Sequence, residues 1–566
     1  LPPPPTPSRT RSIDPDRVRD HHDHTGPPGR LTQPVTNSCS RPDLSLGPSR
    51  YVGQGEEVRV ARPEADGRLL RSVELENVKS FGAAATAELA PITLIYGPNA
   101  SGKSTLLQSL MLAKQSLEEG GLLLNGSHTR LGGFSALIHR HDLQREARIR
   151  LEMDIPDRWE LGSEVFSPAL TRTLEMRIRS GLAGAAELHE VVIGAGDDHF
   201  TFAVDEEGNW QLAADQAVNL VAAITAPERV WHAKPAAKTL SASRSRDVRR
   251  ILKRAEHESV RFGAAGLLPE RLDVDLSPWA DGMSVDSSQL AETSLRRASN
   301  VLDAARAELE RLLREMGYLG PVRSAPRRTY ERGAVSRYRT LDPEGATAAN
   351  FLFDNPSEAR EADRWLAALK IPYSIQVHAL ESAHPGVGDI LHVELSDRRF
   401  SPPVPVSPAD VGFGVSQVLP LVVQLLAAQD QVVCIEQPEI HLHPRLQAEF
   451  AELLIESTLA EGRANQVIVE THSEHLVLRL QRRIREGSLD PDDVSVLYVD
   501  LNEVEQEASI RRLRFDRHGR FIDRWPGGFF DERFAEIFDV EHLPKLPAFN
   551  RDDDEEEEEA PEESRA

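Results

Sequence analysis

The chain has 566 residues, of which 90 are acidic and 66 basic, giving a net charge of −24. This length allows a large core and at least two lobes, while the acidic balance argues against a protein that coats nucleic acid over its whole surface. Only two cysteines are present, which excludes a disulfide framework and favours a reducing cytoplasm. No apolar run approaches the length of a membrane-spanning helix, and no signal peptide is visible, so we expect no membrane partner.

The two ends of the chain differ in composition from its centre. Residues 1–68 are rich in proline and arginine and show no periodicity, so we expect a disordered leader. The sequence does not begin with Met, and whether this leader is translated stays open. Residues 546–566 are dominated by Asp and Glu, which predicts a disordered acidic tail. Residues 69–545 are therefore predicted to form the folded part.

The first motif that carries chemistry follows a predicted buried strand, PITLIY at 91–96. GPNASGKST (97–105) runs directly into an apolar-periodic helix and matches G-x-x-x-x-G-K-[ST] in its required strand–loop–helix context. Such a loop turns backbone N–H groups toward phosphate oxygens, while Lys103 places its charge on the β/γ-phosphates and Ser104 offers its hydroxyl to Mg²⁺. We therefore predict that ATP and Mg²⁺ bind here, with Ser104 as a metal ligand. The predicted nucleotide-binding residues are Gly97, Asn99, Ser101, Gly102, Lys103, Ser104 and Thr105.

A long insertion, residues 143–320, is predicted after this motif. Its first part, from ARIRLEMDI to NWQL, alternates apolar and polar residues as antiparallel strands do. Helices are expected over about 212–263 and 286–316. The second helix has sevenfold spacing of Leu295, Leu302, Leu309 and Met316. That is barely three heptads, enough for one packing helix and too short for a long coiled-coil arm.

Two basic stretches stand out in this acidic chain, at 243–262 and 323–339. The first places several arginines on nearly one side of a predicted helix, and the second interleaves bases with tyrosines. Either stretch can hold the phosphates of DNA or RNA. The alternative is that these side chains are solvated or paired with the many acids.

Three segments that place polar residues beside buried elements follow in the last third of the chain. DVGFGVSQ (410–417) is a Gly-rich turn that opens an apolar helix, and QVVCIEQPE is a buried strand that ends in Glu436. Open α/β sheets place ligands at the carboxyl ends of their strands, so we predict that the carboxylate of Glu436 faces Mg²⁺. The alternative is a core strand that ends in solvated acids. The next strand, VIVE, leads to His472, which either contacts the γ-phosphate or is structural.

Gln437 occupies the position where a glutamate usually activates water. A glutamine does not accept a proton at neutral pH, but it can orient an attacking water. We therefore predict slow hydrolysis, with Gln437 positioning water and Glu439 accepting its proton. The alternative is that Glu439 caps the next helix near His441. Zinc is disfavoured because Glu439, His441 and His443 lack the H-E-x-x-H helix spacing.

Together these motifs resemble the RecF/OLD-type prokaryotic ATPases, in the ABC-class branch that also contains the SMC and Rad50 proteins. GPNASGKST has the Asn typical of that branch, and EQPEIHLHP and ETHSEHL are similar to its Walker B/D-loop and switch-histidine segments. YLGPVRSAPRRTY (318–330) and WPGGFFDERF (525–534) are also similar to segments of ATPases in this group. The turn at 410–417 stands where the signature motif belongs, although Ser416 follows the glycines rather than preceding them.

The resemblance implies an α/β fold, with an ABC-type P-loop ATPase head split over residues 69–545 and an antiparallel β lobe and helical insertion at 143–320. It also implies a homodimer with ATP between the phosphate loop of one copy and the signature turn of the other, where Gly412, Gly414 and Ser416 would contact the nucleotide. OLD nucleases carry a Toprim domain, for which residues 473–566 leave no room, so any cutting is expected from an effector or nuclease partner.

Three functions are compatible with these motifs. The first is a slow ATPase that acts by ATP-dependent head dimerisation in DNA maintenance, DNA repair or phage defence. The second is a nucleotide-gated scaffold that binds ATP with little turnover and regulates an effector. The third, a nucleotide-binding subunit of a transporter, is disfavoured by the long insertion.

Overall fold

The computed structural model describes residues in the range 69–526, all within the compact unit Val60–Ala566. Within that range it leaves out residues 155–158, 162–163, 167–170, 196–197, 205–208, 213–260, 265, 269–305, 308, 334–337, 381–388, 461–462 and 503–505. The predicted leader, the acidic tail, the basic stretch at 243–262 and most of the two predicted insertion helices lie outside the described residues. Of the second helix, residues 309–315 are helical and bury Leu309 and Leu312.

A six-stranded sheet forms the centre of the fold, in the order β12-β17-β18-β3-β19-β20. Its strands are β3 (Ile92–Tyr96), β12 (Gly317–Leu319), β17 (Val432–Glu436), β18 (Gln466–Glu470), β19 (Val494–Asn502) and β20 (Glu507–Leu513). All neighbours are parallel except the β19–β20 hairpin. Every residue of β3, β17 and β18 is buried, as expected for parallel strands covered on both faces. Parallel pairing brings the carboxyl ends of these strands to one edge.

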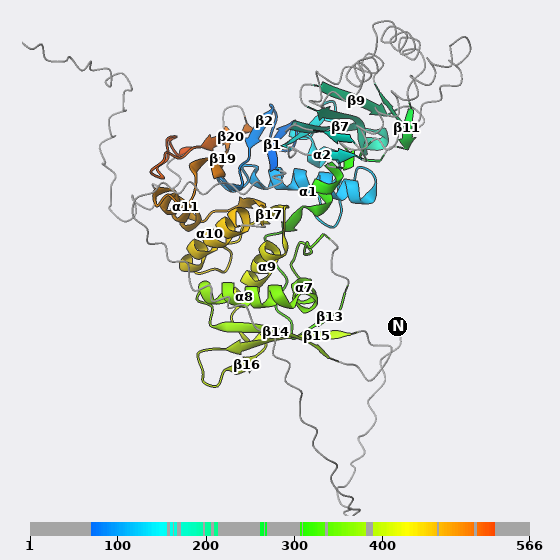
Figure 1. Cartoon of the computed structure of the whole chain (residues 1–566). Helices are drawn as coiled ribbons and strands as arrows, with labels where there is room; N and C mark the ends of the chain where they lie inside the picture. Colours follow the sequence, from blue (N-terminus) through cyan, green and yellow to red (C-terminus); the bar gives the residue numbers. More distant parts are fainter. Residues whose placement is uncertain are drawn as a thin grey trace, which may run out of the picture. The chain divides into compact units, whose positions relative to one another are not determined.

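Helices cover both faces of this sheet (Figure 1). They are α1 (Lys103–Glu119) on one face and α9 (Phe413–Ala427), α10 (Pro444–Leu459) and α11 (Glu474–Arg485) on the other. The alternation along the strands divides the core in two, because Ile95 packs with the α1 side while Leu94 and Tyr96 pack with α9–α11. Among the described helices, none has the length and apolar character needed to cross a bilayer.

An eight-stranded antiparallel sheet packs on the other side of α1, in the order β11-β10-β9-β8-β7-β4-β1-β2. Its strands are β1 (Leu69–Glu76), β2 (Ala85–Glu88), β4 (Ala147–Asp154), β7 (Thr171–Ser180), β8 (Ala186–Ala195), β9 (Asp198–Val204), β10 (Asn209–Leu212) and β11 (Arg261–Ala264). One face buries Ile149, Leu151 and Met176 in the core that α1 shares, while the opposite face is charged. The antiparallel β region expected from the alternating pattern is confirmed.

A third sheet lies against α7 (Ala348–Asp354) and α8 (Pro356–Ala368). Strand β15 (Ile390–Asp397) pairs along its length with β14 (Tyr373–Leu380), and its other edge pairs with β13 (Thr329–Glu331) and β16 (Val404–Val406). Shorter elements complete the described fold: β5 (Trp159–Leu161), β6 (Glu164–Phe166), α2 (Phe134–Leu137), and 3₁₀ turns at His139–His141, Leu182–Gly184, Pro408–Asp410 and Pro491–Asp493. The chain is thus of the α/β class, with a parallel central sheet as expected.

Candidate nucleotide-binding site

A cavity of about 400 Å³ opens at the carboxyl edge of the central sheet, beside the N-terminus of α1. It is lined by Lys79, Ser80, Asn99, Ala100, Gly102, Lys103, Ser104, Thr105, Gln108, Gln437 and Glu470. Of the predicted nucleotide-binding residues, the structure brings Asn99, Gly102, Lys103, Ser104 and Thr105 to the cavity wall. A phosphate placed there would face the N-terminus of a helix, where backbone N–H groups and the helix dipole favour anions.

The loop needs glycine at two positions. Gly97 has a φ of 147°, and a Cβ there would lie 2.0 Å from the carbonyl oxygen of Val499. Gly102 has a φ of 111°, and a Cβ there would lie 2.4 Å from Ser80 Oγ. Any side chain would therefore force the loop away from β19 or from the turn after β1. The two glycines fix the curl that the motif requires.

The ammonium of Lys103 lies inside this loop and its residue is only 4% exposed. Nζ donates to the carbonyl oxygens of Gly97 at 3.0 Å and Pro98 at 2.8 Å. Burial lowers the pKa of Lys103, while the carboxylates of Glu470 and Glu439 oppose that shift. An ammonium has three N–H donors. The two carbonyls occupy two of them, so Lys103 keeps one donor for a phosphate oxygen without leaving the loop.

Two acids end the neighbouring strands β17 and β18, where Glu436 and Glu470 are register partners. Glu470 is 3% exposed, lines the cavity, and accepts a hydrogen bond from the Ser104 side chain. Its Oε2 is buried and has no partner among the described residues. A hydroxyl beside a carboxylate oxygen that lacks a partner is a donor set that suits Mg²⁺, which prefers oxygen ligands.

Glu436 is also buried, at 6% exposure, but it does not line the cavity. Its Oε1 accepts a hydrogen bond of 2.9 Å from the hydroxyl of Tyr318 on β12. Burial raises the pKa of Glu436 to about 7, and the charge of Glu470 adds to that shift. The Tyr318 hydroxyl and the ammonium of Lys79 act in the opposite direction. The structure thus places the predicted metal carboxylate against Tyr318, one strand farther from the loop than Glu470.

Gln437 lines the cavity as the sequence predicts, and its backbone is held in an uncommon conformation. Its φ is 45°, in the left-handed region that side chains other than glycine seldom adopt. Its N–H donates to the Glu470 carbonyl at 2.7 Å, which extends the β17–β18 pairing by one residue. Arg323 Nη2 donates to the carbonyl oxygens of Glu436 at 3.0 Å and Gln437 at 3.2 Å. These contacts stabilise the strained turn and fix the place of the glutamine.

Glu439 connects the turn after β17 with the turn after β18. One carboxylate oxygen accepts from the Thr471 hydroxyl and the other from the His472 backbone N–H, both at 2.7 Å. Helix α10 is capped instead by His443, whose ring accepts from the Arg445 N–H at 3.3 Å. Glu439 is therefore held toward the turn after β18 rather than over the next helix. His472 does not line the cavity. Burial and the charge of Lys103 lower the pKa of His472, while the charge of Glu439 opposes that shift.

The signature-like turn is not part of the cavity wall. Gly412, Gly414 and Ser416 stand at the start of α9, and none of them lines the cavity. A Cβ on Gly414 would lie 3.3 Å from the carbonyl oxygen of His441, so this turn packs against the segment after β17. Within one chain, the structure does not bring these three residues to the phosphate loop.

Sequence reasoning did not name five of the cavity residues: Glu470, Lys79, Ser80, Gln108 and, within the loop itself, Ala100. Glu470 stands at the tip of a short apolar strand, like Glu436, so the same pattern could have identified it. Lys79 follows β1 in the turn ENVKSFG, where its Nζ donates to Gln108 Oε1 at 2.6 Å. Its place beside the loop depends on the packing of β1 against the central sheet, which no local pattern reveals.

A phosphate loop between a buried strand and a helix, with buried acids at the tips of the adjacent parallel strands, defines a P-loop nucleotide-binding domain. Three family models match parts of the chain. "AAA domain, putative AbiEii toxin, Type IV TA system" matches residues 326–479, and a second AAA-domain family matches residues 72–118. A protein family of unknown function matches residues 489–539. The two AAA matches lie on either side of the insertion and support a split P-loop ATPase domain; the finer RecF/OLD resemblance stays a prediction.

Solved structures with a similar chain path are heads of SMC proteins. One is an SMC head bound to the C-terminal winged-helix domain of ScpA, with a TM-score of 0.38, 11% identity, and coverage of 79% of this chain and 98% of that one. The head of the Thermotoga maritima SMC protein has a TM-score of 0.32 and 11% identity, with coverage of 79% of this chain and 99% of that one. A third structure is an SMC head with an extended coiled coil, bound to the C-terminal domain of ScpA and derived from Pyrococcus furiosus. It has a TM-score of 0.38 and 11% identity, with coverage of 84% of this chain and 99% of that one. No curated protein matches the chain significantly.

Proposed function

We propose that this chain is an ABC-class ATPase that binds ATP with Mg²⁺ in the cavity, hydrolyses it slowly, and acts by ATP-dependent dimerisation. The observation that supports this most directly is the convergence of Lys103, Ser104, Gln437 and Glu470 on one cavity at the start of α1. These residues come from three separate segments of the sequence. The functional assignment depends on this geometry and on the AAA-domain matches.

In the proposed mechanism, the loop N–H groups and Lys103 bind the phosphates, and Ser104 with an acid of the Glu436–Glu470 pair would hold Mg²⁺. The metal, when bound, would neutralise charge that develops on the phosphate oxygens. Gln437 orients the attacking water from its fixed turn. Glu439 accepts the proton, and His472 contacts the γ-phosphate from the neighbouring turn.

Dimerisation is proposed because the signature-like turn at 412–416 lies apart from the cavity of its own chain, so a second copy would have to supply it. Sedimentation with ATP and Mg²⁺ tests this, using Glu439→Gln to slow turnover. We expect the mass to double with ATP and to remain that of a monomer without it. Lys103→Ala is the matched control and should stay monomeric under both conditions. A Glu439→Gln protein that binds ATP and stays monomeric would contradict the proposal.

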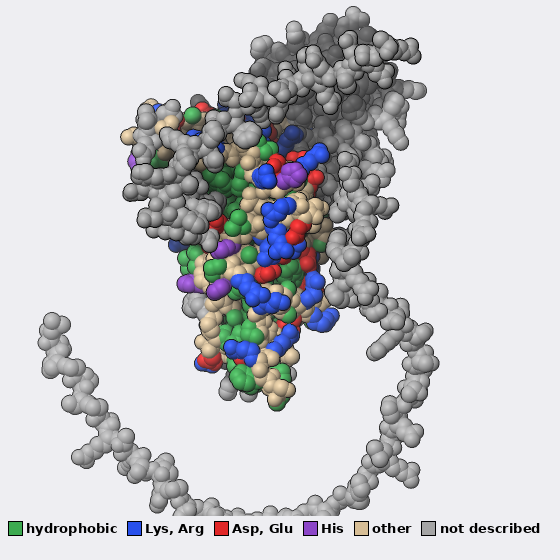
Figure 2. Space-filling view, turned by 90° about the vertical axis from the view of Figure 1, so that its left-hand side faces the viewer, with side chains coloured by type: hydrophobic (Ala, Val, Ile, Leu, Met, Phe, Trp, Pro, Cys, Tyr) green, Lys and Arg blue, Asp and Glu red, His purple; other side chains and the backbone are tan. Residues whose placement is uncertain are grey.

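We propose a cytoplasmic role in phage defence or DNA maintenance, following the sequence resemblance; the matched family description names a putative toxin of a Type IV TA system. The described arginines give DNA binding little support. In the stretch 323–339, Arg328 pairs with Asp410 and Arg339 with Glu358. On the face in Figure 2, blue Lys and Arg side chains form a band with red acids among them. On α11, Arg479 pairs with Glu449 and Glu452. Arginines paired in this way favour the structural alternative for the basic stretch at 323–339.

The second candidate is a nucleotide-gated scaffold that regulates an effector or nuclease partner. It is favoured by two observations: Gln437 replaces a proton-accepting glutamate, and both oxygens of Glu439 already accept hydrogen bonds. These two donors occupy lone pairs of the carboxylate that would otherwise be open to an attacking water. Single-turnover hydrolysis of radiolabelled ATP separates the two functions, since the scaffold should hold ATP without forming ADP.

A further inference from the structure

A strongly basic segment ends the described part of the chain. Residues 511–524, RRLRFDRHGRFIDR, contain six arginines, one histidine and two aspartates. With the histidine neutral, six arginines against two aspartates give a net charge of +4, in a chain whose net charge is −24. None of these residues lines the nucleotide cavity. We call residues 511–524 the basic hairpin.

The fold anchors the basic hairpin and leaves its charged side chains at the surface. After β20, Phe515 pairs with Phe521, and the N–H of Asp516 donates to the carbonyl oxygen of Arg520 at 2.8 Å. Gly519, in the turn between them, has a φ of 71°, and a Cβ there would lie 2.2 Å from the carbonyl oxygen of a residue of α11. The turn is therefore held against the folded domain. The exposed basic side chains of the hairpin are Arg511, Arg514, Arg517, His518, Arg520 and Arg524.

The two aspartates of the hairpin are already in use. Asp523 pairs with Arg514 at 2.9 Å. One oxygen of Asp516 accepts from the backbone N–H groups of His518 and Arg520, both at 2.8 Å, and so holds the turn closed. Three exposed arginines are left without a salt bridge to any acid in the described ranges: Arg517, Arg520 and Arg524. They differ in this from Arg328 and Arg339, which are paired.

The acidic run of the same chain has the complementary charge and lies within reach. Residues 552–559 are eight acids in succession, DDDEEEEE, with a net charge of −8. The residues between the hairpin and this run, 525–551, span at most about 90 Å when fully extended. A covalent link of this length keeps the local concentration of the run high. We propose that the acidic run 552–559 binds the basic hairpin of its own chain, chiefly through Arg517, Arg520 and Arg524.

Nucleic acid is the other polyanion that surface arginines bind. Proteins that bind single strands commonly add aromatic rings on which the bases stack. The rings of this hairpin are turned inward instead: Phe515 is buried, and Phe521 packs against Phe515 and Trp525. The hairpin thus presents charge without a stacking surface, which favours a run of carboxylates as its occupant. This inference concerns a surface outside the nucleotide cavity and does not depend on the proposed function.

Binding of a fluorescent peptide with the sequence of residues 551–566, followed by anisotropy, tests the proposal. The peptide is added to the full chain and to a neutral-run chain, which is the full chain with the eight acids 552–559 replaced by their amides. We expect the neutral-run chain to bind the peptide, and to bind it more weakly as salt is added. The wild-type chain should bind it at least about tenfold more weakly, because its own run occupies the hairpin.

A second comparison locates the site. Arg517→Gln, Arg520→Gln and Arg524→Gln together, in the neutral-run chain, should weaken peptide binding about tenfold, since three exposed charge contacts are lost. The matched control removes three exposed arginines elsewhere, by Arg327→Gln, Arg360→Gln and Arg445→Gln, and should leave the affinity unchanged. If the triple hairpin variant does not fold, Arg517→Gln alone decides, with an expected loss of about two- to threefold.

The proposal is overturned if the neutral-run chain does not bind the peptide, or if the wild-type and neutral-run chains bind it equally well. Equal losses in the hairpin and control variants also overturn it, because the peptide would then respond to the overall charge rather than to the hairpin. An undiminished affinity in a folded hairpin variant has the same meaning. A neutral-run chain that binds a short single-stranded DNA through the hairpin arginines, but not the peptide, would make the hairpin a nucleic-acid surface instead.

Discussion

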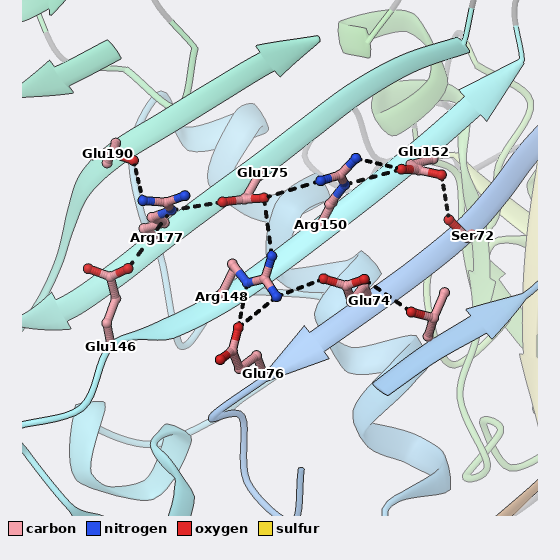
Figure 3. Close-up of polar contacts among 11 residues, drawn as sticks. Ser72, Glu74, Glu76, Glu146, Arg148, Arg150, Glu152, Glu175, Arg177 and Glu190 are labelled. Atoms are coloured by element: carbon pink, nitrogen blue, oxygen red, sulfur yellow. Dashed lines mark hydrogen bonds and ion pairs between the residues drawn. The ribbon is translucent and has the colours of Figure 1, made fainter. Parts of the chain in front are cut away.

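The two large sheets use buried charge in opposite ways. On the outer face of the antiparallel sheet, Glu175 has a side chain that is only 5% exposed, yet it pairs with Arg148, Arg150 and Arg177 at 3.6, 3.8 and 2.7 Å (Figure 3). These arginines in turn reach further glutamates, such as Glu190, so the charges form a connected network across β1, β4, β7 and β8. Each acid of this network finds its partner within the fold.

At the carboxyl edge of the parallel sheet, the buried acids are not neutralised in this way. Glu436 and Glu470 lie side by side at the strand tips, and Glu470 keeps an oxygen without a partner among the described residues. Buried charges that the fold satisfies are structural, whereas a buried charge that it leaves incomplete points to a ligand. The difference between the sheets therefore separates a structural network from a binding site, and substitutions in each should have separable effects.

The largest effect is expected from Lys103→Ala. Removing the ammonium from the loop should weaken ATP binding at least 100-fold, because charge-assisted contacts to the phosphates are lost. Isothermal titration with ATP and Mg²⁺ measures this. Arg150→Gln, in the charged face of the antiparallel sheet, is the control and should bind ATP like wild type. Unchanged affinity in a folded Lys103→Ala protein would show that ATP binds elsewhere.

A smaller effect is expected in turnover. Glu439→Gln should lower kcat by roughly 100-fold, within the range for losing a general base, while sparing ATP binding. Gln437→Glu should turn over at the wild-type rate or faster, because it adds a proton acceptor at the cavity. Single-turnover kinetics measures both. Wild-type turnover in Glu439→Gln would place the base at another residue and leave Glu439 as the link between the two turns.

The smallest effects concern stability and mark the structural network. Glu175→Ala leaves three arginines without their common acid and should reduce the free energy of unfolding by about 1–2 kcal/mol, less than for a fully buried pair because the arginines are partly exposed. Glu190→Ala, at the edge of the network, should cost only about 0.5 kcal/mol. Denaturant unfolding followed by circular dichroism measures both. Equal costs for the two substitutions would mean that Glu175 is not the centre of the network.

The phosphate loop could be predicted from the sequence because all its parts are contiguous: a buried strand, a turn that requires glycine, and a helix. The antiparallel strands were likewise predictable from alternation. Of the two strand-tip acids, only Glu436 was named from the sequence. Glu470 also ends a short apolar strand, and only the strand order shows that Glu470 lies on the strand that borders β3. Lys79 was missed for the same reason, since tertiary packing brings the turn after β1 to the loop. The sheet of β13–β16 was also not anticipated from the sequence.

The signature-like turn shows a further limit of local patterns. Gly412 and Gly414 were predicted to contact ATP through a family resemblance, and their position apart from the cavity is compatible with that role only in a second copy. Whether the nucleotide site is complete within one chain depends on how copies of the chain assemble, which a local sequence pattern does not encode.

The most direct test of the central claim is the ATP turnover rate per molecule, measured over a range of protein concentrations that spans the dimerisation midpoint. If the site is completed by a second copy, the rate per molecule should be slow and should rise with protein concentration to a plateau. A rate that does not change with concentration, while sedimentation shows the chain passing from monomer to dimer, would contradict completion of the site by a partner. Saturated ATP binding without any turnover would instead identify the chain as a nucleotide-gated scaffold.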